Sequence, residues 1–319
     1  MKVLRIAISA WSSVLFCLLI VLVDWEQVRG DKFPDILNYV YKIDAIRLLG
    51  VEYFYLGETW IDYLKNEYAW FFMLYLIAKS SLDPFFALKI ISGFSAFVYH
   101  RFLATGVGNV LAFILLLNPI TIDLLSSQLR GAFAFSLFLV AVMLLRRRVF
   151  FFATIPFLGY IHSAMFVLGS LFFASHWLAN LRGLKTQQKI FIAVGFAASF
   201  AALISIIVPF ILSTIGDRRS LEGVGNKSTL YVAFWLIWGV MLVVSIRSRL
   251  DIDWAYLFAI VICVSVPVMT ILGFPGFRLL ALSLPIVLLS LARLAANQRV
   301  FAGLGLILYQ AVLFYYWIA

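Results

Sequence analysis

The sequence predicts an all-α, polytopic membrane protein of about eleven transmembrane helices, with an additional short periplasmic or re-entrant helix. Three observations favour this class. The 319-residue chain is 64% hydrophobic, only 13% of its residues are charged, and its mean hydropathy is +1.04. A soluble domain would carry more charge, and a membrane β-barrel would alternate apolar and polar residues instead of showing continuous apolar runs.

The first apolar run, residues 6–23, follows Lys2 and Arg5 and ends at Asp24 without a small-residue cleavage site. It is long for the core of a signal peptide, so we expect a transmembrane helix that begins in the cytoplasm. Apolar runs of spanning character recur along the chain. The expected spans cover residues 5–23, 84–99, 103–118, 130–145, 149–162, 163–179, 190–214, 229–246, 254–272, 278–292 and 300–318.

One further apolar run, residues 67–78 (EYAWFFMLYLIA), is too short for a full span. If it lies on the outer surface or re-enters it, most basic residues fall in the cytoplasm and only Asp251 and Asp253 are cytoplasmic acids. If it crosses, basic loops move outside, against the positive-inside tendency. We therefore expect the amino terminus inside and the carboxyl terminus outside.

We expect a single integral membrane domain over residues 1–319, with two external segments, 24–83 and 215–228. The first is rich in acidic and aromatic residues and too long to be a simple connector, so we expect it to carry function. The net charge of +10 is explained by cytoplasmic loops and not by binding of nucleic acid. Cys17 and Cys263 lie in apolar runs, which predicts neither a disulfide framework nor a metal cluster.

Ionisable side chains are expected to gather at the outer face. A lone arginine at a helix end usually reaches to lipid phosphates, and a lone histidine among apolar residues is usually structural. Here, however, several such residues share one side. They are Arg130 at the start of a span, His162 at an outer turn, Arg278 after a Gly/Pro bend, Asp217, Arg218 and Arg219 in the short outer loop, and Asp35 and Glu67 in the long segment.

Converging arginines suit a lipid-linked phosphate or pyrophosphate, because a guanidinium stays ionised and makes bidentate contacts with phosphate oxygens. They would stabilise a pyrophosphate leaving group without a metal ion, so we expect no metal and no cofactor. A carboxylate or the imidazole would act as general base toward a hydroxyl group. We assign Arg130, Arg278, Arg218 and Arg219 to phosphate binding, and Asp35, Glu67 and His162 are candidate bases or sugar contacts.

The segment SSQLRGAFAFSLFLVAVMLLRRR (126–148), followed by FLGYIHSAMFVLG (157–169), resembles the EpsG-like and Wzy-type bacterial polysaccharide polymerases. The elements FPDILNYVY and NEYAWFFML add to the resemblance. The arginine–glutamine pair of that family appears here as Arg130-Gly131, so we take Gln128 as the substitute sugar contact. Tyr39 and Asp217 are further substrate-binding candidates.

The resemblance implies a membrane-embedded glycosyltransferase of the bacterial inner membrane, with its active face in the periplasm. It would polymerise undecaprenyl-pyrophosphate-linked oligosaccharide repeat units into O-antigen, capsule or exopolysaccharide and release undecaprenyl pyrophosphate. The implied partners are these lipid-linked oligosaccharides, membrane lipid and a chain-length regulator.

Two alternatives stay open. An O-antigen ligase releases the same product but usually has its large periplasmic loop late in the chain, whereas the long outer segment here is early. A non-enzymatic transporter or flippase for lipid-linked sugars should show paired halves with broken helices or midplane charges. The ionisable residues of this chain are expected at one face only.

Overall fold

The structure is a computed structural model that describes residues 2–50, 62–63, 66–144, 148–214, 229–245 and 252–318. Every regular element in these ranges is a helix, which confirms the all-α prediction for the described part of the chain. The chain divides into two compact units, Met1–Gly169 with Ala302–Ala319, and Ser170–Phe301. The single integral membrane domain expected over residues 1–319 stays a prediction.

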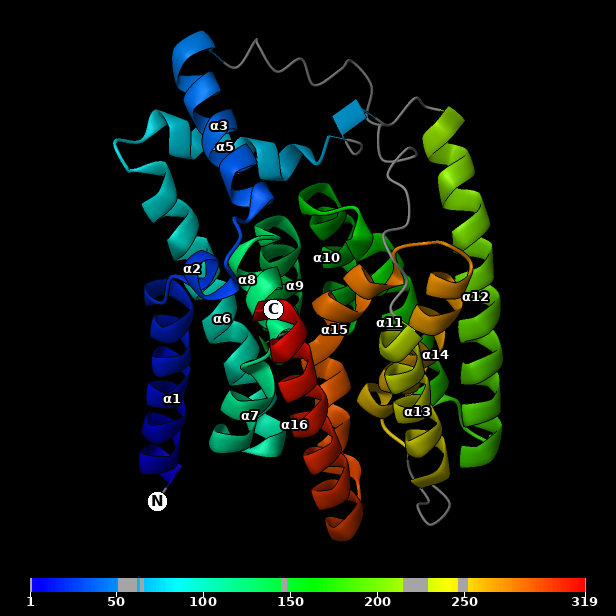
Figure 1. The fold of residues 1–319 in the computed structure, drawn as a ribbon. Helices are drawn as coiled ribbons and strands as arrows, with labels where there is room; N and C mark the ends of the chain where they lie inside the picture. The colour runs from blue at the N-terminus through cyan, green and yellow to red at the C-terminus, as the bar shows by residue number, and fades with distance from the viewer. Residues whose placement is uncertain are drawn as a thin grey trace. The chain divides into compact units, whose positions relative to one another are not determined.

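The first unit is a bundle of helices arranged around α6 (Figure 1). α6 packs along α1 and against α7, α8 and α9, and α9 packs against α10. The helices are α1 (Lys2–Leu22), α2 (Trp25–Arg29), α3 (Pro34–Leu49), α5 (Tyr68–Lys79), α6 (Pro84–Val107), α7 (Asn109–Leu116), α8 (Pro119–Ser126), α9 (Leu129–Leu144), α10 (Arg148–Ile161), the start of α11 (Ala164–Asn180) and the end of α16 (Ala296–Ile318).

The predicted span 103–118 is wrong in its boundaries. α6 continues to Val107 and ends at Gly108, whose φ of 90° is readily adopted by glycine. α7 then begins, and the chain bends by 78° between α7 and α8. By length and composition the two short helices are either one broken span or a re-entrant loop, and this bend was not predicted.

Side chains satisfy the backbone groups that the break leaves unpaired. The Asn118 amide donates to the carbonyl of Leu115 at 2.7 Å, and its Oδ1 accepts from the N–H of Thr121 at 2.9 Å. Gln310 of α16 donates to the same Leu115 carbonyl at 2.7 Å. An unpaired backbone group in a membrane interior costs several kcal/mol, so these contacts stabilise the bend.

The predicted external segment 24–83 contains three helices in its described residues. Figure 1 shows α2, α3 and α5 beyond the carboxyl end of α1, with α2 beside α6 and α5 near the start of α6. α5 coincides with the short apolar run, so its helical character is confirmed, while its position at the membrane surface stays a prediction. α2 and α3 were not predicted.

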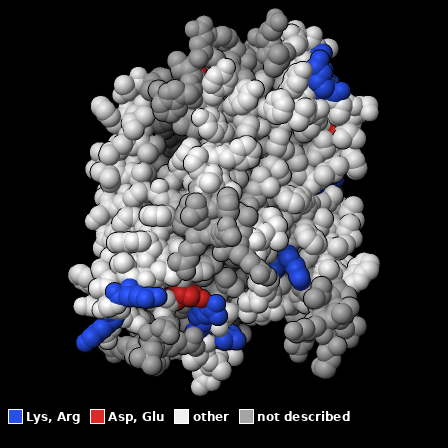
Figure 2. Space-filling model, turned by 180° about the vertical axis from the view of Figure 1, so that it is seen from behind, with Lys and Arg blue, Asp and Glu red and all other residues white. Residues whose placement is uncertain are grey.

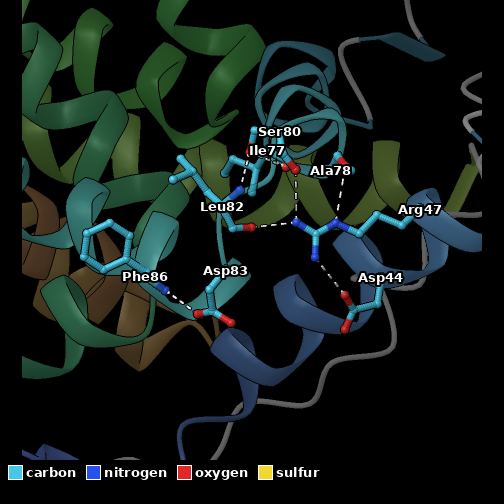
Figure 3. Close-up of polar contacts among 8 residues, drawn as sticks. All are labelled: Asp44, Arg47, Ile77, Ala78, Ser80, Leu82, Asp83 and Phe86. Atoms are coloured by element: carbon cyan, nitrogen blue, oxygen red, sulfur yellow. Dashed lines mark hydrogen bonds and ion pairs between the residues drawn. The ribbon is translucent and has the colours of Figure 1, made fainter.

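Arg47 joins α3 to the end of α5 (Figure 3). Its guanidinium donates to the carbonyls of Ala78 at 3.3 Å, Ser80 at 3.5 Å and Leu82 at 2.6 Å, and it lies 3.6 Å from the Asp44 carboxylate. The last carbonyls of a helix have no partner within it, and Arg47 supplies one. The contact therefore fixes α3 to the end of α5.

The second unit is built around α14, which packs against α12, α13 and α15. Buried hydroxyls join these helices: Tyr256 donates to the Leu242 carbonyl at 2.7 Å, and Ser265 donates to the Ala197 carbonyl at 3.2 Å. The elements are the rest of α11, α12 (Thr186–Thr214), α13 (Thr229–Ser245), α14 (Trp254–Ile271), α15 (Gly276–Leu289), η3 (Ser290–Arg293) and the start of α16.

The described helices have the character of membrane spans. Four are long and apolar enough to cross a membrane, or five if α7 and α8 count as one span, and shorter apolar helices of 10–17 residues add to them. Figure 2 shows few charged side chains on the face that it presents. Large apolar side chains such as Phe191 and Phe301 are exposed, which soluble proteins avoid in extended patches. Crossing eleven times stays a prediction.

We predict that Asn118→Leu, which keeps the side-chain size but removes its hydrogen bonds, lowers the free energy of unfolding by about 1–3 kcal/mol. The measurement is the thermal unfolding midpoint of the purified protein in mild detergent. Asn180→Leu, at an exposed position near the end of α11, serves as control. Equal midpoints for both variants would show that the polar contacts at the break contribute nothing.

Candidate active site

Arg130 is the second residue of α9, directly after the turn that ends α8. A cation at a helix amino terminus is disfavoured by the helix dipole, so it needs compensation by an acid. Glu67 provides this: its Oε2 forms an ion pair with Nη1 of Arg130. The Nε of Arg130 donates to the Tyr39 hydroxyl at 3.1 Å, and the guanidinium carbon lies 5.9 Å from the centre of that ring.

Glu67 immediately precedes α5 and holds its backbone in the left-handed region, with φ 52° and ψ 57°. Among the described residues it is the only one other than glycine with a positive φ. Such a conformation costs about 1–3 kcal/mol and persists where the surroundings enforce it. The Glu67 carbonyl accepts from the N–H groups of Trp70 and Phe71 at 2.9 Å and 3.1 Å, so the same residue starts α5.

The Glu67 carboxylate is buried, with 2% of its side chain exposed, and both oxygens are bonded. While Oε2 contacts Arg130, Oε1 accepts from three donors of the α10–α11 turn. These are Nδ1 of His162 at 2.8 Å, the backbone N–H of Ser163 at 3.0 Å and the Ser163 hydroxyl at 3.2 Å. One carboxylate therefore joins the outer segment to both α9 and the α10–α11 turn.

The turn that carries His162 is held by close packing of α10 against α11. A Cβ on Gly159 would lie 2.1 Å from the ring of Phe166, so glycine is required for this approach. Because a carboxylate only accepts, Nδ1 of His162 carries a hydrogen. Its Nε2 has no hydrogen-bond partner among the described residues, and 21% of the side chain is exposed. This nitrogen is the available acid/base atom of the ring.

The environment shifts two pKa values at the site. Burial by itself raises the pKa of Glu67, but the charge and hydrogen bond of His162, the charge of Arg130 and the Ser163 N–H outweigh it and hold that pKa well below its usual value. Burial raises the pKa of Tyr39 to about 12, although Arg130 opposes this. Glu67 therefore stays ionised, and Tyr39 keeps a proton that it can donate.

A second carboxylate lies next to this group. Asp123 of α8 accepts from Nη1 of Arg29 at 3.3 Å and from the Gln128 amide at 3.2 Å. Asp35 of α3 interacts electrostatically with both Asp123 and Arg130. Among the described residues Asp35 has no hydrogen bond or ion pair through its side chain, and it is partly exposed. It is the unbonded carboxylate of the cluster.

The structure thus brings together Arg130, Tyr39, Glu67 and His162 by direct contact, with Asp35 and Gln128 beside them. Arg278 begins α15 in the second unit, where its guanidinium carbon lies 6.0 Å from the Phe277 ring. Asp217, Arg218 and Arg219 lie outside the described residues.

Sequence reasoning missed three members of the cluster, Arg29, Asp123 and Ser163. Asp123 had a usable signal, because it is a single acid within the apolar stretch PITIDLLS and such residues usually have a partner. Arg29 and Ser163 had no such signal in the sequence, since their partners come from segments distant in sequence.

Comparison of the chain with protein-family models, with curated proteins and with solved structures finds no match.

We predict that Glu67→Gln lowers the free energy of unfolding near neutral pH by about 2 kcal/mol, because it replaces the carboxylate that pairs with Arg130 by a buried neutral amide. The pKa of Glu67 is depressed in the fold, so its contribution is complete above the ordinary glutamate pKa of about 4.3. This contribution to the free energy of unfolding is lost as the pH falls toward the pKa of Glu67 in the folded protein. The reason is that Glu67 in the unfolded chain binds its proton at a higher pH than in the fold.

The measurement is denaturant unfolding of both proteins in detergent across this pH range. The difference between wild type and Glu67→Gln should narrow as the pH falls below the ordinary value. Asp31→Asn, a matched loss of charge at an exposed position, should show no such dependence. A difference that is constant with pH would mean that the Glu67 carboxylate is not ionised in the fold.

Proposed function

We propose that this chain is a membrane-embedded glycosyltransferase that polymerises undecaprenyl-pyrophosphate-linked oligosaccharide repeat units at the periplasmic face and releases undecaprenyl pyrophosphate. The observation that carries the proposal is the buried Glu67 carboxylate bonded to both Arg130 and His162. It places a guanidinium and an imidazole from different segments at one partly exposed position. The guanidinium suits the binding of a phosphate, and the imidazole suits proton transfer.

Arg130 supports phosphate binding through the donors that it retains. A guanidinium has five N–H groups, and the contacts with Tyr39 and Glu67 occupy two of them. The side chain is 36% exposed, so the remaining donors are accessible to a ligand. Tyr39 adds a hydroxyl that stays protonated. Together they would bind the oxygens of a departing pyrophosphate, where negative charge develops during transfer.

His162 is the base in this proposal, and Glu67 is assigned to positioning because all of its oxygens are occupied. Nε2 of His162 takes the proton of an acceptor hydroxyl, and the hydroxyl oxygen bonds to the anomeric carbon of the donor. The bond from that carbon to the pyrophosphate oxygen breaks, and its electron pair leaves with the pyrophosphate. The Glu67 carboxylate stabilises the imidazolium that forms.

The proposed topology is eleven spans with the site facing the periplasm. In the first unit, Trp25 follows α1 and Trp317 lies near the end of α16, with ring centroids 6.4 Å apart. The carboxyl ends of these helices therefore meet at one level, as expected if both run outward. Tryptophan favours the membrane interface, and Glu67 belongs to the segment that begins at this level.

We predict that Arg130→Ala abolishes chain extension while the protein still inserts, although its free energy of unfolding falls because the Glu67 carboxylate loses its ion pair. The assay uses purified protein in liposomes with a synthetic undecaprenyl-pyrophosphate-linked repeat unit, and polymer length is read on a gel. Arg182→Ala, an exposed arginine in the second unit, is the control and should give the wild-type ladder. A full ladder from Arg130→Ala would refute the assignment, and translocated but unextended lipid would favour a flippase.

A second prediction separates the two candidate bases. If Nε2 of His162 is the base, His162→Gln removes the activity, because the amide cannot take up the proton of the acceptor hydroxyl. Asp35→Asn should keep most of the activity and change mainly the KM, as a sugar contact would. Loss of activity in Asp35→Asn, with activity kept in His162→Gln, would transfer the role of base to Asp35.

A further inference from the structure

A cavity of about 240 Å³ lies in the first unit, between the carboxyl end of α1, α2 and the first turns of α6. Apolar side chains form most of its wall, among them Val21 and Leu22 of α1, Ile36 of α3, and Phe85 and Leu88 of α6. α1 is an apolar helix, and Trp11, Leu15, Leu18 and Leu22 of its later turns are exposed. A hydrocarbon chain that enters this cavity would continue along an apolar helix surface.

One cation, Lys89, lines the cavity, and a second, Arg29, lies over the ring of a residue that lines it. Lys89 is exposed and has no ion pair among the described residues. Arg29 lies over the ring of Phe33 at 5.5 Å, and Phe33 also lines the cavity. Arg29 uses Nη1 to bind Asp123 at 3.3 Å, and most of its five N–H donors have no partner among the described residues. Both cations are therefore able to bind an anion.

The carboxylates at the cavity are bonded to the backbone. Asp24 accepts from the N–H of Gln27 at 3.1 Å and so caps α2. Glu26 accepts from the N–H of Phe33 at 2.8 Å and so fixes the turn before α3. These acids shape the segment around the cavity, whereas the Lys89 ammonium has no such role.

A hydroxyl also lacks a partner here. The Oγ of Ser126, which lines the cavity, is buried without a hydrogen bond among the described residues. Ser126 lies three residues after Asp123 on α8, so the cavity is adjacent to the Arg29–Asp123 pair. A buried hydroxyl without a partner is costly, and a polar ligand atom would satisfy it.

We propose that this cavity binds a lipid phosphate, with Arg29 and Lys89 on the phosphate and the first carbons of the chain between α1 and α6. Apolar walls at the end of an apolar helix, together with one cation that lines the cavity and a second beside Phe33, fit an anionic amphiphile. A glycerophospholipid and a polyprenyl phosphate share this chemistry. The site does not use Glu67, Arg130 or His162 and does not depend on the proposed polymerase activity, but it adjoins the candidate active site through the Arg29–Asp123 pair.

The test measures binding to the purified full-length protein in mild detergent by native mass spectrometry, with no turnover. The probes are phosphatidic acid and farnesyl phosphate, and inorganic phosphate serves as a probe of the head group alone. Wild type should bind a lipid probe, and Lys89→Ala, which breaks no contact in the described part of the chain, should bind it about tenfold more weakly. Arg29→Lys, which keeps the charge but loses the planar fork, should also weaken binding.

Ile36→Trp, which fills the cavity from α3, should weaken both lipid probes and leave inorganic phosphate unaffected. Lys79→Ala removes an exposed cation of α5 and should bind like wild type. Tighter binding of phosphatidic acid would identify a membrane phospholipid as the ligand, and tighter binding of farnesyl phosphate would identify a polyprenyl phosphate. Unchanged lipid binding in Lys89→Ala or in Ile36→Trp would overturn the proposal, whatever the polymerase assay shows.

Discussion

The arrangement of the first unit depends on one buried carboxylate. Removing a carboxylate from water is costly unless opposite charges and hydrogen bonds compensate it. Glu67 obtains this compensation only when α9 and the α10–α11 turn lie against the start of α5. The electrostatic requirement of a single side chain thus sets where three segments meet. The same contacts hold Glu67 in its left-handed backbone conformation, because its carboxylate bonds to both Arg130 and His162 from there.

The described ionisable groups of the first unit are of two kinds: some are bonded to other groups of the protein, and some are not. Glu67, Asp24 and Glu26 have carboxylate oxygens bonded to groups of the protein, and they fix backbone or side-chain positions. Nε2 of His162 and the carboxylate of Asp35 are without bonds among the described residues. Groups of the second kind can exchange protons or bind a substrate without loss of the fold. Because the bonded groups fix the fold, a few contacts are enough to hold the unbonded groups of the candidate site in place.

Much of the fold class and part of the site could be predicted from the sequence. Arg130, His162 and Glu67 were found because a charge or an imidazole beside apolar residues requires a partner. Which partner each one has could not be predicted, because the contacts join positions separated by 63 and 95 residues. The bend after Leu116 was missed for a similar reason. The Leu115 carbonyl accepts from the nearby Asn118 and also from Gln310 of α16, and no local pattern reveals the second contact.

The contact between Gln310 and Leu115 bridges 195 positions of the sequence and has a consequence for biogenesis. During synthesis the amino-terminal bundle enters the bilayer well before α16 emerges from the ribosome. Until α16 is made, the Asn118 amide alone among the described side chains holds the Leu115 carbonyl. A chain that ends before α16 should therefore have a less stable bend between α7 and α8.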